Sequence, residues 1–202
     1  LLISFLFKYY FTNDYHYVVL DYYRGQYYSI IYDYEKAITY FHRVNDNASM
    51  HQYFNVYRFL STQWLAYIAR IRKEWQKAIE LNAKAIELSE QAGHSACYNY
   101  KETGLIYDML NNPEKATAYY KQAYSCAKSN PKFENRFVIS QTYLELGKLY
   151  LKRNDINNAI FYLNEAIIEN RKIHDIFSKQ LIYTNLGRCL IKKKNYKAAL
   201  DT

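Results

Sequence analysis

Residues 143–166, YLELGKLYLKRNDINNAIFYLNEA, contain two apolar stripes on either side of a polar turn. The apolar and small residues of this stretch recur at helical spacing: Tyr143, Leu146, Gly147, Tyr150, Ala159, Leu163 and Ala166. Spacing of i, i+3, i+4 and i+7 places side chains on one face of a helix. The stretch therefore predicts two paired helices, and its glycine lets the second helix approach the first closely.

The same pattern recurs along the chain. A small residue lies twelve residues before an alanine in five pairs: Gly25 and Ala37, Ala66 and Ala78, Gly104 and Ala116, Gly147 and Ala159, Gly187 and Ala199. The steps between successive small residues, which we call anchors, are 41, 38, 43 and 40 residues. A period of this size indicates a solenoid of stacked helical units, each too small to bury its own apolar face.

At these positions the chain resembles the tetratricopeptide repeat, whose pattern is W-x2-L-G-x2-Y followed by A-x3-F. The copies around Gly104, Gly147 and Gly187 match well, and the first two copies are degenerate. The resemblance implies an all-α fold: a right-handed superhelical solenoid of antiparallel helix pairs with about five repeats. The proline that ends the family pattern is missing, so we expect longer helices of about 18 residues.

We expect a single domain over residues 1–202, truncated at both ends. Residues 1–12 are interpreted as the end of a preceding helix. The expected repeats lie near residues 13–49, 50–93, 94–130, 134–174 and 175–202, of which the last is incomplete.

Motifs for catalysis and for cofactor binding are missing from the sequence. The five histidines form neither an HExxH motif nor an i, i+4 pair. There is no phosphate-binding glycine loop and no G-x-S-x-G motif. We therefore expect a protein that is not an enzyme, with no catalytic residue, no metal site and no cofactor.

Charge and aromatic residues are distributed unevenly. Residues 1–100 carry ten Lys and Arg against nine Asp and Glu, whereas residues 101–202 carry seventeen against ten. This excess favours an acidic peptide or protein partner. Eleven of the 25 tyrosines lie between Tyr9 and Tyr40, in the half of the chain whose positive and negative charges nearly balance. Nucleic acid is not expected as a ligand, because a stacking platform needs aromatic and basic residues together.

Location is predicted from cysteines and hydropathy. The three cysteines are scattered without a CxxC motif, which favours reduced thiols and a cytoplasmic protein. The alternative is the periplasmic sensor segment of a membrane-anchored regulator. No apolar run is long enough to cross a bilayer, so no membrane contact is expected for this segment. The oligomeric state is left open.

In tetratricopeptide arrays the first helix of each pair lines the concave face. Residues about a quarter turn from the buried stripe should face an extended peptide there, with amides meeting its backbone and cations meeting its acidic groups. The candidate binding residues are Gln26, Gln63, Tyr67, Arg70, Lys101, Asp108, Lys148 and Arg188.

Repeats near 40 residues resemble those of bacterial signalling proteins, including the Rap phosphatase regulators. Residues 21–28, DYYRGQYY, are similar to the opening of a Rap-type first repeat. This resemblance implies a peptide- or protein-binding array that is the sensory or scaffold segment of a signalling or transcriptional regulator. Two alternatives stay open: an assembly scaffold without a small peptide ligand, and an RNA-binding helical array.

Overall fold

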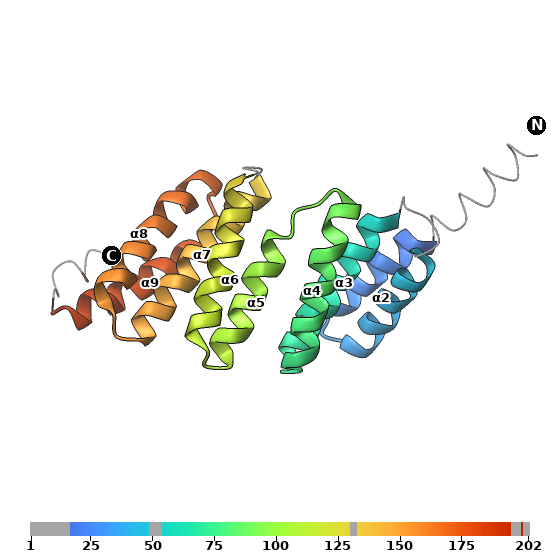
Figure 1. Cartoon of the computed structure of the whole chain (residues 1–202), viewed down its shortest axis with the longest axis horizontal. Helices are drawn as coiled ribbons and strands as arrows, with labels where there is room; N and C mark the ends of the chain where they lie inside the picture. Colours follow the sequence, from blue (N-terminus) through green and yellow to red (C-terminus); the bar gives the residue numbers. More distant parts are fainter. Residues whose placement is uncertain (1–16, 49–53, 130–132, 195–198, 200–202) are drawn as a thin grey trace, which may run out of the picture. The chain divides into compact units, whose positions relative to one another are not determined.

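The computed structural model describes residues 17–48, 54–129, 133–194 and 199, and the expected helix end at residues 1–12 lies outside them. Every regular element of the described residues is a helix (Figure 1), which confirms the all-α class. Helical residues 17–30 are followed by α2 (Tyr34–Ala48), α3 (Asn55–Ile71), α4 (Trp75–Ala92), α5 (Cys97–Met109), α6 (Pro113–Ser129), α7 (Phe133–Lys152), α8 (Ile156–Ile173) and α9 (Ile176–Lys192). Their lengths are close to the expected 18 residues in α4, α6 and α8.

The turns that follow the first helices share one backbone conformation. The residue seven positions after each anchor has a positive φ, between 57° and 63°: Tyr32, Lys73, Asn111, Asn154 and Lys194. In four of these turns the next amide donates to the carbonyl five residues earlier, as Asn112 N does to Tyr107 O at 2.8 Å. This is the Schellman arrangement, which satisfies carbonyls at the end of a helix.

In the turns at Tyr32, Lys73, Asn111 and Asn154, the residue after the left-handed position immediately precedes the second helix. Asp33, Asn112 and Asp155 each accept a hydrogen bond from the backbone N–H three residues later, at 3.0–3.3 Å. These side chains are N-caps, which supply partners to amides that the helix itself leaves unpaired. At the equivalent position of α4, Glu74 makes no such hydrogen bond.

Three of the anchor glycines are sites of close helix approach, as the sequence predicts. A Cβ atom built on Gly104 would lie 2.7 Å from the ring of Tyr120, and one on Gly147 would lie 2.7 Å from Leu163 Cγ. The contacting residue lies sixteen positions after the anchor, so the large side chain, rather than the alanine at twelve, fills the space that the glycine leaves. Beyond the turn that follows Gly187, only residue 199 is among the described residues.

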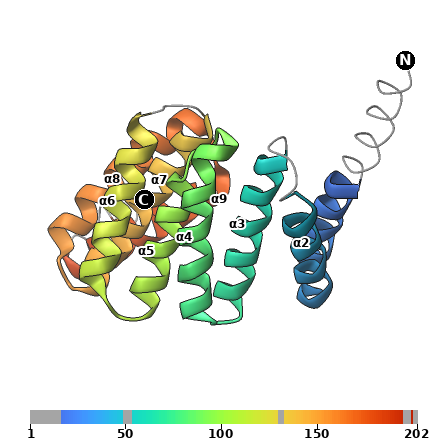
Figure 2. The same ribbon diagram turned by 45° about the vertical axis from the view of Figure 1, so that its right-hand side comes forward.

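The chain forms two compact units, unit 1 (Leu1–Asn99) and unit 2 (Tyr100–Thr202), and the division falls within α5. In unit 1, α3 and α4 lie side by side (Figures 1 and 2). The larger core of unit 1 surrounds Phe41 and Leu65, and that of unit 2 surrounds Leu163 and Ile182. The single domain over residues 1–202 stays a prediction.

The expectation of reduced thiols is wrong for two of the three cysteines. Cys97 and Cys126 are disulfide-bonded, and Cys189 is free and buried. The cysteines therefore give no support to a reducing compartment, because disulfides persist mainly under oxidising conditions.

Candidate functional site

A cavity of about 420 Å³ lies in unit 1 and is lined by Gln63, Trp64, Tyr67 and Tyr98. We call it the α3 pocket, because its first three residues belong to α3 and the fourth to the start of α5. Gln63 and Tyr67 are four residues apart and thus share one face of α3. The cavity combines three aromatic rings with a single amide, a lining typical of ligand sites that are mostly apolar with few polar groups.

The aromatic wall is held by the core beneath it. The Trp64 ring stacks on Phe41, with centroids 6.0 Å apart, and meets the edge of Tyr67 at 5.7 Å. Phe41 is fully buried. The guanidinium of Arg70 lies 5.2 Å from the Tyr67 ring centroid, within reach of a cation–π interaction. Trp64 and Tyr67 are therefore positioned before any ligand arrives.

The Tyr22 hydroxyl joins the helix formed by residues 17–30 to this wall. Gln26 Nε2 donates to Tyr22 Oη at 2.9 Å, and the Trp64 side chain is also hydrogen-bonded to Tyr22. Burial raises the pKa of Tyr22, so its hydroxyl stays neutral at ordinary pH. Through this hydroxyl, Gln26 helps to fix the orientation of Trp64.

A chain of side-chain amides connects the polar edge of the pocket to α4. Gln63 Nε2 donates to Asn99 Oδ1 at 2.7 Å, and Asn99 Nδ2 donates to Asn82 Oδ1 at 3.0 Å. Asn82 Nδ2 donates in turn to Ala78 O at 3.0 Å. Asn82 and Asn99 are buried, so these bonds satisfy groups that water does not reach.

The structure brings together the four candidate residues of unit 1. Gln63 and Tyr67 line the α3 pocket, Arg70 lies over Tyr67, and Gln26 reaches Trp64 through Tyr22. Sequence reasoning missed Trp64, Tyr98, Asn82 and Asn99.

The four candidate residues of unit 2 have different environments. Lys101 is buried, and its ammonium lies 3.0 Å from Glu102 Oε1 and 2.7 Å from Gln141 Oε1. It is therefore not an open surface cation, contrary to what the groove prediction requires. Lys148 pairs with Glu145 at 2.6 Å, Asp108 pairs with Lys152 at 3.2 Å, and Arg188 is exposed.

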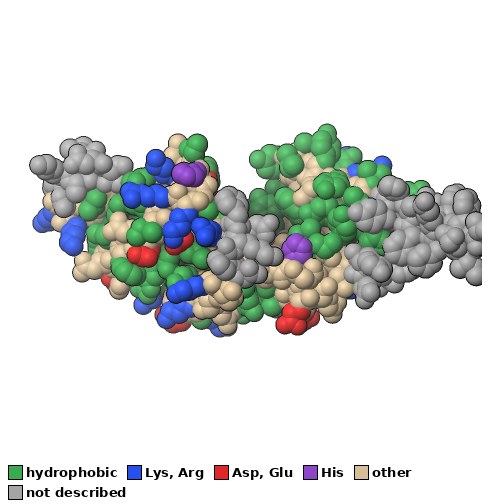
Figure 3. Space-filling model, turned by 90° about the horizontal axis from the view of Figure 1, so that it is seen from above, with side chains coloured by type: hydrophobic (Ala, Val, Ile, Leu, Met, Phe, Trp, Pro, Cys, Tyr) green, Lys and Arg blue, Asp and Glu red, His purple; other side chains and the backbone are tan. Residues whose placement is uncertain are grey.

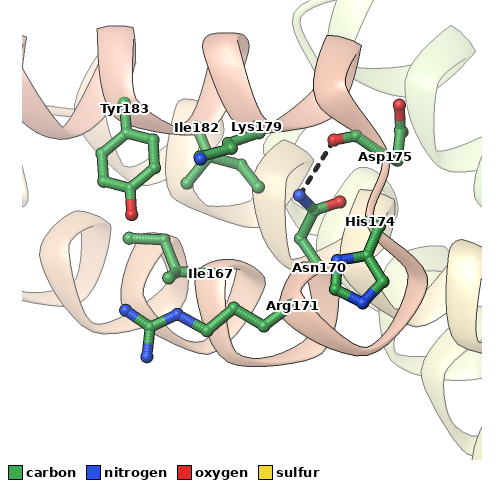
Figure 4. Close-up of a pocket in the computed structure, with 8 residues that line it drawn as sticks. All are labelled: Ile167, Asn170, Arg171, His174, Asp175, Lys179, Ile182 and Tyr183. Carbon is green, nitrogen blue, oxygen red and sulfur yellow. Dashed lines mark hydrogen bonds between the residues drawn. The ribbon is translucent and has the colours of Figure 1, made fainter.

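A second cavity, of about 310 Å³, lies between α8 and α9 in unit 2 (Figure 4). Arg171 and Ile167 approach it from α8, and Lys179 and Tyr183 approach it from α9. The buried Asn170 donates to Asp175 O at 2.9 Å, which ties the two helix ends together. None of the residues expected to bind a ligand lines this cavity.

The two units also differ in surface chemistry. The face of unit 1 seen in Figure 3 is mainly hydrophobic, whereas that of unit 2 carries several Lys and Arg side chains. Within the described ranges, no three His, Cys, Asp or Glu side chains are grouped so that they could hold a metal ion. No helix among the described residues is long and apolar enough to span a membrane.

Two family models of the tetratricopeptide repeat match the chain, one over residues 58–129 and one over residues 140–170. Together they cover about half of the sequence and include the helices that form the α3 pocket and the α7–α8 pair. The chain belongs to the tetratricopeptide-repeat family. The matched ranges confirm the repeat pattern for three of the five anchor pairs: Ala66 and Ala78, Gly104 and Ala116, and Gly147 and Ala159.

The similar proteins include Rap regulators. Response regulator aspartate phosphatase E of Bacillus subtilis (strain 168) is 30% identical over 95 residues, which are 47% of this chain but only 25% of that protein. The apo form of RapI superposes with a TM-score of 0.76 at 16% identity, and the match covers 93% of this chain and 52% of RapI. The Rap conjugation gene regulator of plasmid pLS20, solved in complex with the Phr* peptide, has a TM-score of 0.68 at 16% identity, with coverages of 91% and 50%. At these identities the solved structures show a shared fold.

Proposed function

We propose that this chain is a non-enzymatic helical-repeat array that binds a peptide or protein as the sensory or scaffold segment of a bacterial signalling or transcriptional regulator. The α3 pocket is the observation that carries the proposal. It offers fixed aromatic walls and one amide, which suits recognition of an extended peptide. The similarity to a regulator solved with the Phr* peptide supports the same class of ligand.

Binding, rather than catalysis, fits the chemistry of the pocket. Its lining residues are three aromatic side chains and an amide, whereas general acid–base and nucleophilic catalysis need a group that exchanges a proton or attacks the substrate. The B. subtilis relative is named a phosphatase, and for this chain we propose the binding role alone.

An acidic or carboxylate-bearing ligand remains part of the proposal. Arg70 is the candidate cation beside the α3 pocket, and Lys148 and Arg188 are the candidates in unit 2. Because Lys101 is buried beside Glu102, a charge test should use Arg70→Glu with Lys148→Glu. We expect this pair to weaken capture of acidic peptides at least tenfold, about 1.4 kcal/mol, in a binding titration. Lys84→Glu with Lys121→Glu, on exposed positions of α4 and α6, is the matched control.

A peptide-library capture read by mass spectrometry tests the proposed function. We expect the chain to select short peptides, and we expect Tyr67→Ala to abolish the selection. Tyr27→Ala removes an exposed tyrosine outside the pocket, and it should leave capture unchanged. Selection of a folded protein alone would support the assembly scaffold. A sub-micromolar, sequence-selective RNA complex at physiological salt would support the RNA-binding alternative.

A cytoplasmic location is also a proposal, and the periplasmic sensor segment is its alternative. The proposal depends on the similarity to Rap regulators, since the cysteines do not support it. Fractionation of cells that express the natural protein, with detection of this segment, distinguishes the two compartments.

A further inference from the structure

The amide chain beside the α3 pocket has a fixed direction. Ala78 O is a backbone carbonyl and can only accept, so the group of Asn82 that faces it must be Nδ2. Asn82 Oδ1 then faces Asn99, and Asn99 must present Nδ2 to it. The backbone of α4 thereby determines how two buried side-chain amides are oriented.

The same constraint passes to the wall of the pocket. Because Asn99 turns Nδ2 towards Asn82, its other terminal atom, Oδ1, faces Gln63. This oxygen can only accept, so Gln63 must turn Nε2 towards it. Gln63 Oε1 is the terminal atom that the amide chain does not use, and no donor to it is found among the described residues. Turning the Gln63 amide over would bring two oxygen atoms within hydrogen-bond distance, which is unfavourable. The pocket thus presents a hydrogen-bond acceptor of set orientation beside three aromatic rings.

We propose that the α3 pocket is a subsite for one bulky apolar residue of a bound peptide, and that Gln63 Oε1 accepts the backbone N–H of that residue. This inference rests on the proposed function and names the chemistry of its ligand. A cavity of about 420 Å³ accommodates a large side chain, and Trp64, Tyr67 and Tyr98 give it apolar contacts on several sides.

Charged side chains fit this subsite poorly. A carboxylate would meet the Gln63 oxygen and the negative faces of the aromatic rings. A cation would meet Arg70, whose guanidinium already lies 5.2 Å from the Tyr67 ring centroid. Any acidic group of the ligand therefore belongs outside the pocket.

The tryptophans provide a direct reporter. The chain has two tryptophans, Trp64 and Trp75, so Trp75→Phe leaves Trp64 as the only indole, at the pocket. The probe is acetyl-Ala-Ala-Phe-Ala-Ala-amide. Three relatives accompany it, in which the Phe nitrogen is methylated, Phe is replaced by Ala, or Phe is replaced by Asp. Binding is followed by the fluorescence of Trp64 during titration.

We expect saturable binding of the Phe probe, about fivefold weaker binding of the N-methylated probe, which loses one hydrogen bond, and the weakest binding of the Ala and Asp probes. In Gln63→Leu the N-methylated and unmethylated probes should bind within twofold of each other. If methylation acted through steric bulk, the difference would persist in Gln63→Leu, and the assignment of the N–H to Gln63 would be wrong.

A variant outside the pocket tests the direction of the amide chain. Asn82→Leu removes the bond to Ala78 O, which frees Asn99 and Gln63 to turn, so discrimination against the N-methylated probe should fall as in Gln63→Leu. Asn185→Leu is the matched control, because Asn185 makes the same bond to the carbonyl four residues earlier but lies in unit 2. Thermal melting checks that each variant folds, and if Asn82→Leu does not fold, Gln63→Leu carries the test alone.

The outcomes separate this inference from the proposed function. Peptide capture by the wild type together with equal binding of the two Phe probes would overturn the subsite and leave the peptide-binding function standing. Preference for the Asp probe over the Phe probe would overturn the subsite in the same way. Absence of both peptide capture and probe binding would overturn both proposals.

Discussion

At the scale of single residues, an anchor glycine leaves no room for a larger side chain. At Gly104 a Cβ atom would lie 2.7 Å from the ring of Tyr120, which is fully buried. We expect Gly104→Ala to lower the free energy of unfolding by about 1–3 kcal/mol through overpacking. Lys121→Ala, at an exposed position of α6, is the control and should change it by less than about 0.5 kcal/mol. Urea denaturation measures both, and equal effects would contradict the close packing at Gly104.

The sequence predicts the structural role of a residue well where the packing requires one type of amino acid. Glycine at the anchors follows from close helix approach, and that requirement is visible in the amino-acid type. The α3 pocket is only partly predictable: Gln63, Tyr67 and Arg70 follow from the phase of one helix. Tyr98 and the amide chain through Asn82 and Asn99 depend on how α4 and the start of α5 pack on α3, and no local spacing encodes that packing.

At the scale of helices, the start of α4 differs from the other described second-helix starts, because its N-cap side chain makes no capping hydrogen bond. Glu74 is too long to cap α4 from its position, whereas the shorter Asp33, Asn112 and Asp155 cap theirs. We expect Glu74→Asp to stabilise the chain by about 0.5–1 kcal/mol, because it supplies the missing acceptor. The exposed ion pair between Glu74 and Lys77, at 3.2 Å, contributes little to stability, so losing it would cost less than the cap gains.

Asp155→Ala is the comparison for this prediction. It removes an existing cap from α8 and should cost about 1 kcal/mol. Thermal melts of the two variants, read by circular dichroism, should shift in opposite directions. A lower melting temperature for Glu74→Asp would show that the ion pairs of Glu74 outweigh the cap.

At the scale of the whole molecule, the tyrosines make stability sensitive to alkaline pH. Burial is the main cause that raises the pKa in five of them: Tyr22, Tyr34, Tyr119, Tyr143 and Tyr162. A folded-state pKa above the unfolded value means that the stabilisation is complete below about pH 10 and is lost as the pH rises through the folded-state values. We therefore expect the urea concentration at the unfolding midpoint to decrease once the pH rises above about 10.

Tyr119→Phe isolates one contribution to this loss. Burial is the largest cause that raises the pKa of Tyr119, so removal of its hydroxyl should make the alkaline decline less steep. Tyr27→Phe changes an exposed tyrosine and serves as the control. If both variants decline as steeply as the wild type, ionisation of Tyr119 does not contribute to alkaline unfolding.

The five left-handed turns bear on how quickly the chain folds. In four of them the amide that closes the turn bonds to a carbonyl only five residues earlier. A hairpin closed by such local bonds forms without the entropic cost of joining distant segments, and chains dominated by local contacts fold in microseconds to milliseconds. Folding can begin in any hairpin and extend to its neighbour, so a change in one turn should slow a local step while the other hairpins still form at their own rates.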